Sequence, residues 1–151
     1  MRRLYIVGIA LGVVLFLAIS ALLARVLSVD GAERSAITTL LQAQARGDAT
    51  GMIRLIQGCQ HDPACQQRAA QNVARLTRPG DVKILELNPS AGFSLSSTLG
   101  TARVAWRAGN ALPIVQCVRV RRAGNVLSGL HVELLEISAR IKTDTSCPAH
   151  Y

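Results

Sequence analysis

The two side chains best spaced for acid–base chemistry are His131 and Glu133, in the run GLHVELLEI. Residues two apart on a β-strand point to the same face, so this imidazole and carboxylate would lie side by side. Such a pair supplies the base and the proton donor that a hydrolase or isomerase needs. The competing interpretation is a polar pair on the solvent face of an antiparallel strand, which we favour because such faces are commonly polar. We therefore expect no catalytic residue, and His131 and Glu133 are the candidates if the chain is an enzyme.

A second group of reactive side chains lies in CQHDPAC, where Cys59, His61 and Cys65 are possible metal ligands. A structural zinc site needs four ligands at a recognisable spacing, and the fourth would have to come from a distant part of the chain. We therefore expect no metal. No glycine-rich phosphate loop, nucleophile elbow or haem attachment motif occurs either, so we expect no cofactor.

The four cysteines, Cys59, Cys65, Cys117 and Cys147, are better explained as disulfide partners. An even number of cysteines in an exported chain is typical of two disulfides, and three pairings are possible. The short separation favours Cys59 with Cys65. Cys117, on a predicted strand, would then tether the C-terminal tail through Cys147.

Basic residues gather in VQCVRVRRAGN, within a chain of formal charge +8. Period-two alternation places Arg119 and Arg121 on the face opposite the valines, either as a face that binds an anionic partner or simply as the solvent face. A three-residue turn at 123–125 would put Cys117 opposite His131, and Val115 opposite Glu133. The arginines would then share their outward face with the candidate acid–base pair.

The N-terminal segment determines where these residues would work. Leu4–Ala24 holds twenty-one residues without a charge, and about 20 are enough for a helix to cross a bilayer. Arg2 and Arg3 precede it, so the positive-inside rule places the N-terminus in the cytoplasm and the remaining chain outside. A signal peptide cleaved near Ser20, which would release the domain, is the alternative. Nucleic acid is not an expected partner in either case.

Three helices are predicted beyond the apolar segment. The first covers 31–46, where apolar residues recur at helical spacing. Gly47 ends it and Asp48 caps the second helix. Asp62 caps the third, with Pro63 at its first position, and this thinly apolar helix is expected to lie across a surface.

Four antiparallel strands are predicted after the helices, because the apolar period changes from about 3.6 to 2. Glycine–asparagine turns at 109–110 and 124–125 join the last three strands. Residues 90–100 are either a long loop or a weak strand. The predicted strands are 82–87, 101–107, 112–122 and 126–139. The fold class is α+β, and the chain divides into an anchor at 1–28, an exported domain at 31–141 and a disulfide-tethered tail at 142–151.

The order of these elements, the ARGDATGMIRLI helix-turn-helix and the strands CVRVRR and GLHVELLEI resemble the nuclear transport factor 2-like (cystatin-like) superfamily. The likeness is greatest to small bacterial members held by one N-terminal membrane helix. It covers roughly 31–141 and implies a cone-like fold, with helices packed on a curved sheet and a pocket between them. Members serve as isomerases, dehydratases, small-ligand binders, and assembly or secretion modules, so membership alone selects no function.

We therefore expect a single-pass protein of a bacterial envelope whose exported domain is a noncatalytic binding or assembly module. Its partner would be another envelope protein, or a small apolar ligand in an aliphatic pocket, and it could form oligomers. The alternative is a membrane-anchored hydrolase or isomerase that uses His131 and Glu133.

Overall fold

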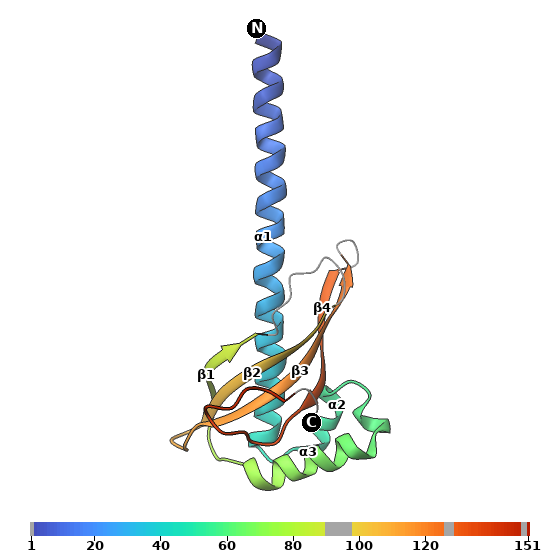
Figure 1. The fold of residues 1–151 in the computed structure, drawn as a ribbon, viewed down its shortest axis with the longest axis vertical. Coiled ribbons are helices and arrows are strands. Elements are labelled where there is room, and N and C mark those ends of the chain that lie inside the picture. Colours follow the sequence, from blue (N-terminus) through green and yellow to red (C-terminus); the bar gives the residue numbers. More distant parts are fainter. Residues whose placement is uncertain (1, 90–97, 126–128, 149–150) are drawn as a thin grey trace.

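The computed structural model describes residues 2–89, 98–125, 129–148 and 151, which form an α+β fold with the predicted order of elements (Figure 1). Helices precede a four-stranded antiparallel sheet whose strands follow one another in the order β1-β2-β3-β4. The predicted loop or weak strand at 90–100 falls mostly outside the described residues. The elements are α1 (Arg2–Ala45), α2 (Ala49–Leu55), the short 3-10 helix η1 (Cys59–His61), α3 (Pro63–Leu76), β1 (Val82–Asn88), β2 (Thr98–Ala108), β3 (Ile114–Asn125) and β4 (Gly129–Ile137).

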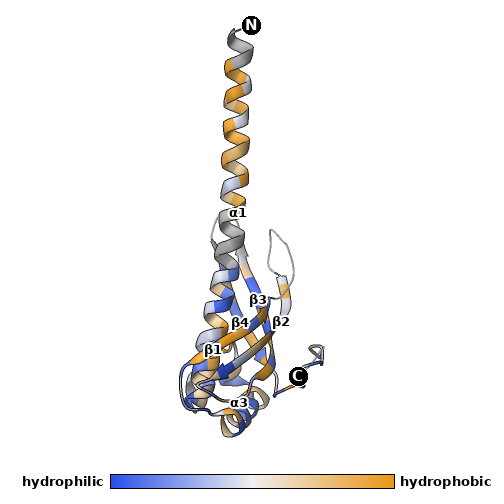
Figure 2. Cartoon of the chain, turned by 90° about the vertical axis from the view of Figure 1, so that its left-hand side faces the viewer, coloured by the Kyte–Doolittle hydropathy of each residue, from blue (hydrophilic) through white to orange (hydrophobic). Residues whose placement is uncertain are grey.

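Helix α1 is one continuous helix of 44 residues with two different parts. Its segment Ile6–Leu23 is long and apolar enough to cross a membrane, and none of it is buried within the protein. Its last turns instead hold fully buried residues, Ile37, Leu40 and Leu41. Figure 2 shows the change from an apolar to a mixed surface along the helix. The helix that we expected to begin at Gly31 therefore has no separate start, because one glycine costs a helix only about 1 kcal/mol.

The turns between the helices follow the predicted capping. Gly47 and Gly58 have φ values of 82° and 76°, the left-handed region that glycine adopts without strain. The Asp48 carboxylate accepts a hydrogen bond from the Gly51 amide at 2.7 Å. The Asp62 carboxylate accepts one from the Ala64 amide at 2.9 Å, ahead of Pro63 at the start of α3. These caps fix the short connections that fold α2 and α3 back onto α1.

One face of the sheet packs against the helices and forms the core. Alternate residues of β2 and β3 point inward, and the bulges described below keep the apolar residues of β1 and β4 in phase with them. Figure 1 shows α1 running behind the sheet, with α2 and α3 at its lower end. The core includes Ile37, Leu40, Leu41, Met52, Ala102, Val104, Trp106, Ile114, Val118, Val120, Leu134 and Ile137.

Two register shifts shape the outer strands. In β1, Ile84 pairs with Trp106 while Glu86 pairs with Ala105, which leaves Leu85 as an extra residue. In β4, Leu134 pairs with Val120 while Glu136 pairs with Arg119. Such bulges bend a strand and reset the direction of the side chains that follow. As a result Glu136 faces the same side as Glu133, although the two are an odd number of residues apart.

The C-terminal tail covers part of the outer face of the sheet. The Ile141 amide donates to the Val115 carbonyl at 2.8 Å, so the chain continues along β3 beyond the end of β4. Cys117 then pairs with Cys147, and Cys59 with Cys65, which are the pairings favoured by the sequence. Val115 and Cys117 are buried under this tail. The predicted solvent face of β3 is therefore exposed to solvent only from Arg119 onward.

Candidate functional site

His131 and Glu133 share the outer face of β4, as predicted, and lie against each other. The Nε2 atom of His131 is 3.2 Å from Oε1 of Glu133. The other oxygen of Glu133 accepts a hydrogen bond from Nε of Arg121 at 2.6 Å. The hydrogen bond from Arg121 holds the pKa of Glu133 below its ordinary value, with a smaller contribution from His131. A carboxylate with a lowered pKa that is already bound to a guanidinium is a weak general base.

The partners of this pair differ from those expected from the sequence. His131 lies opposite Ala123, and Glu133 lies opposite Arg121, so the predicted pairing of these residues with Cys117 and Val115 is wrong. The reason is that β3 does not turn at Ala123 but continues to Asn125, with Gly124 accommodated in the strand at φ 109°. The shift covers an even number of residues, so the polar pair still faces outward.

Arg119 and Arg121, the candidate face for an anionic partner, are both paired with carboxylates of β4. Nη1 of Arg119 is 3.3 Å from Glu136, and Nη2 of Arg121 is 2.5 Å from Glu133. The Arg119 guanidinium also lies over the Tyr151 ring, 5.7 Å from its centroid. Cross-strand pairs of opposite charge stabilise a hairpin. The positive charge of this face is therefore largely neutralised by the protein itself.

Arg122 was not considered as a site residue in the sequence, yet it contacts two carboxylates of α1. Its Nε and Nη2 atoms donate to Glu33 at 2.9 and 2.7 Å, and Nη2 also donates to Asp30 at 2.7 Å. Glu33 is fully buried, and the Arg122 side chain is only 15% exposed. Burial alone lowers the pKa of Arg122, but the contacts with Glu33 and Asp30 outweigh it and raise that pKa. The sequence did contain a signal for this inward position, because period-two alternation places Arg122 on the same face as Val118 and Val120.

The space between sheet and helices, where the superfamily resemblance implies a pocket, is occupied at its centre by a hydrogen-bonded network. Oε1 of Gln116 accepts hydrogen bonds from the Gln44 amide and from the Trp106 indole, both at 2.9 Å. All three side chains are fully buried. Because each donor meets an acceptor, the network avoids the cost of unpaired polar groups.

The network continues to the chain that leaves β4. The Gln116 amide and the Asn72 amide both donate to the Ser138 carbonyl, at 2.9 and 3.1 Å. The Ser138 hydroxyl accepts from the Cys117 amide at 2.9 Å. Gln116 of β3 thereby links α1 to the Ser138 carbonyl, and Asn72 links α3 to the same carbonyl. The side chains that form this network are buried, and none of them is titratable.

The CQHDPAC loop is closed by its disulfide and is not arranged as a metal centre. Both cysteines are consumed in the Cys59–Cys65 bond, and His61 is exposed. Within the part of the chain that the structure describes, no group of three or more His, Cys, Asp or Glu side chains could hold a metal ion. The disulfide joins η1 to the first turn of α3.

Comparison with known proteins identifies no relative. No protein-family model, no curated protein and no solved structure matches this chain.

Proposed function

We propose that the chain is a single-pass envelope protein whose exported domain is a noncatalytic module that assembles with another protein. The observation that carries this proposal is the buried network that links the sheet to α1. If the fold is a nuclear transport factor 2-like cone, the Gln44–Gln116–Trp106 network would occupy the space in which an enzyme of that superfamily holds its substrate. The strongest acid–base pair, His131 and Glu133, lies instead on the outer face, in contact with Arg121.

The anchoring part of the proposal is supported by α1. The apolar window Ile6–Leu23 lies outside the fold, and the same helix ends in the core. A signal sequence has the same length and composition, so removal near Ser20 is the alternative fate. Arg2 and Arg3 favour a cytoplasmic N-terminus, and two disulfides favour an oxidising compartment for the domain.

The fold is proposed to be a nuclear transport factor 2-like cone. In support, helices pack on one face of a four-stranded antiparallel meander, with bulges in both outer strands that would curve it. Within such a cone the network around Gln116 would fill the usual ligand space. The proposal therefore favours a protein partner, bound at the surface, over a small apolar ligand.

The experiment that tests the proposal is crosslinking in native membranes with a reagent that does not cross them. We expect a defined protein to be captured by the full-length chain and not by a chain whose domain has been unfolded by Trp106→Asp. If the full-length chain captures no more protein than the Trp106→Asp variant does, an assembly function is contradicted.

The enzymatic alternative is tested in parallel. Under the proposal, His131→Ala and Glu133→Gln leave the cellular phenotype and the crosslinking pattern unchanged. A loss of phenotype in both variants, with folding intact, would instead support a hydrolase or isomerase.

A further inference from the structure

The direction in which β3 runs relative to α1 follows from two contacts. Gln116 is hydrogen-bonded to Gln44 of α1. Six residues further along β3, Arg122 is hydrogen-bonded to Glu33, which is eleven residues nearer the N-terminus of α1. Eleven residues of helix measure about 16 Å and six residues of strand about 20 Å, which agree within the reach of an arginine side chain. Strand β3 therefore rises beside α1 toward its apolar segment, as Figure 1 shows.

The end of the β3–β4 hairpin reaches the level of the membrane surface. Strand β3 continues three residues beyond Arg122, to Asn125, which pairs with Gly129 of β4. Three strand residues measure about 10 Å, the rise of about six or seven helix residues. The pair is therefore level with Val26 of α1, about 5 Å beyond Leu23, where the apolar window ends. The headgroup layer on each side of a bilayer is about 5–7 Å thick, so with α1 across a bilayer this backbone lies among the headgroups.

The strand positions next to this pair lie slightly farther from the bilayer. His131 pairs with Ala123, two residues before Asn125, and so stands about 7 Å farther out. Its side chain is 62% exposed. We call Ala123, Gly124, Asn125, Gly129 and His131 the proximal end of the sheet.

The proximal end does not depend on anionic lipids for contact with the membrane. Arg121 and Arg122, the arginines of β3 closest to it, are both paired with carboxylates of the protein. An unpaired basic patch would draw a domain onto an anionic membrane, and salt would weaken that attraction. Here the height of the domain is set by α1 itself, through the buried pair of Arg122 and Glu33.

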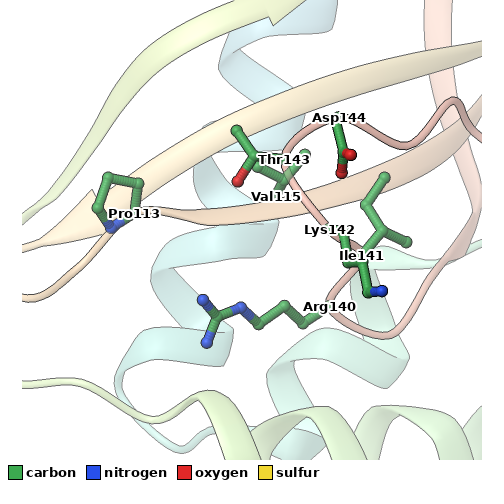
Figure 3. A pocket seen from close by; sticks show the side chains of 7 residues that line it. All are labelled: Pro113, Val115, Arg140, Ile141, Lys142, Thr143 and Asp144. Atoms are coloured by element: carbon green, nitrogen blue, oxygen red, sulfur yellow. The ribbon is translucent and has the colours of Figure 1, made fainter.

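The opposite end of the sheet stands well clear of the membrane. Gln44, the partner of Gln116, is 21 residues beyond Leu23, which corresponds to about 32 Å along a helix. A pocket of about 490 Å³ lies at this distal end, where Pro113 and the tail line it (Figure 3). Leu112, next to Pro113, is 80% exposed. This end therefore lies beyond the headgroups, in the compartment where a protein partner can reach it.

From these heights we infer that the proximal end of the sheet rests on the lipid headgroups of the leaflet from which α1 emerges. The domain then stands upright on the membrane, with its distal end and the pocket there turned toward the partner protein. This inference rests on the proposed membrane anchoring and adds which end of the domain meets the lipid.

The test measures depth by tryptophan fluorescence. The full chain is placed in phosphatidylcholine nanodiscs in which some headgroups carry a nitroxide, which quenches only tryptophans close to it. Asn125→Trp should lose most of the emission that it adds to the wild-type chain. Leu112→Trp, at the exposed distal end, is the matched control and should lose none. The native Trp106, buried and opposite Ile114, supplies an unquenched background.

A longer α1 should lift the proximal end off the membrane. Seven alanines inserted between Val26 and Leu27 add about 10 Å and turn the domain by only about 20°. The quenching of Asn125→Trp should then be lost. In the chain without the insertion, quenching should be equal at about 0.1 M and about 1 M salt, because paired charges do not draw the domain down.

The anchor is tested separately with Leu15→Trp and a nitroxide on the lipid acyl chains. Leu15 is exposed within the apolar window, so this tryptophan is quenched if α1 spans the bilayer. Quenching of Leu15→Trp without quenching of Asn125→Trp overturns the inference and leaves the anchor standing. If Leu15→Trp is not quenched, the proposed anchoring itself fails.

Three further results would overturn the inference. Equal quenching of Asn125→Trp and Leu112→Trp would mean that the domain does not stand upright, and quenching that survives the insertion would mean that α1 does not set its height. Loss of quenching at high salt would assign the contact to charge attraction. Thermal unfolding shows whether each variant is folded, and His131→Trp, on the neighbouring strand, is the second probe if Asn125→Trp unfolds the domain.

Discussion

Arg122 of β3 and Glu33 of α1, 89 positions apart in the sequence, are joined by two hydrogen bonds of 2.7 and 2.9 Å to one carboxylate oxygen. Glu33 is fully buried, and it lies ten residues beyond Leu23, the end of the apolar window, on the same helix. The pair therefore connects the sheet to α1 close to the point where the helix would leave the membrane. It fixes the direction of the domain relative to the apolar part of α1.

Replacing the arginine of this pair should destabilise the domain strongly. Arg122→Met removes the guanidinium that donates two hydrogen bonds to the buried Glu33 carboxylate, and breaking a buried ion pair typically costs about 3–5 kcal/mol. The free energy of unfolding can be measured with urea in detergent, using the fluorescence of Trp106, the one tryptophan of the chain.

The double variant Arg122→Met with Glu33→Leu is the control for that experiment. It removes both charges, so most of the lost stability should return. A single variant within about 0.5 kcal/mol of wild type, the range of ordinary surface substitutions, would show that the pair does not hold the sheet to α1.

The interior network predicts a second large effect. Gln116→Leu removes the acceptor of the Trp106 indole and of the Gln44 amide. Each buried polar group left unpaired costs about 1–3 kcal/mol, so the two groups together give an expected loss of about 2–6 kcal/mol. Gln71→Leu, at an exposed position of α3, should change stability little. If Gln116→Leu were instead stabilising, the region would be better described as ordinary apolar core.

Local features of this fold could be predicted from the sequence. The caps at Asp48 and Asp62 and the glycine at Gly47 form within a few residues, so their side chains identify them directly. The two disulfides follow from the cysteine spacing once an exported chain is assumed. The α+β class and the four strands follow from the change of apolar period. The nuclear transport factor 2-like cone remains a proposal.

The predictions that failed concern features that depend on contacts between residues far apart in the sequence. The Ala123-Gly124-Asn125 sequence has the composition of a turn, but the strand passes through it, because pairing with β4 as far as Gly129 outweighs the local preference. The continuity of α1 through Gly31 was missed because the glycine was given the weight of a helix start, although it costs a helix only about 1 kcal/mol. The acid–base pair was placed correctly on one outward face. Its guanidinium partner, Arg121, could not be assigned until the register was known.

The two disulfides should contribute unequally to stability. They close loops of 6 and 30 residues in sequence separation, and the loop-entropy relation then gives about 2.2 and about 3.6 kcal/mol. Cys117→Ser with Cys147→Ser should therefore lower the unfolding free energy by about 1 kcal/mol more than Cys59→Ser with Cys65→Ser. Equal losses would show that the Cys117–Cys147 bond does not restrict the unfolded chain as this relation requires.

Glu133 should titrate at unusually low pH because Arg121 stabilises its charged form. A group whose pKa is depressed in the folded state contributes stability above its unfolded pKa, and that stability is lost as pH falls through the folded pKa. The contribution is therefore intact at neutral pH and disappears only in acid, below the ordinary value of 4.5. Carboxyl-carbon NMR should show the pKa of Glu133 rising in Arg121→Ala. An unchanged pKa would mean that the ion pair does not form in solution.

The sidedness of Cys117 and Cys147 is the measurement that tests the central claim most directly. Intact cells would be treated with a reductant and a thiol label that do not cross membranes, and the membrane fraction would then be washed with carbonate. An exported domain anchored by α1 predicts that both cysteines are labelled only after reduction, without permeabilisation, on a chain that stays in the membrane fraction. Free thiols that are labelled only after permeabilisation would contradict it.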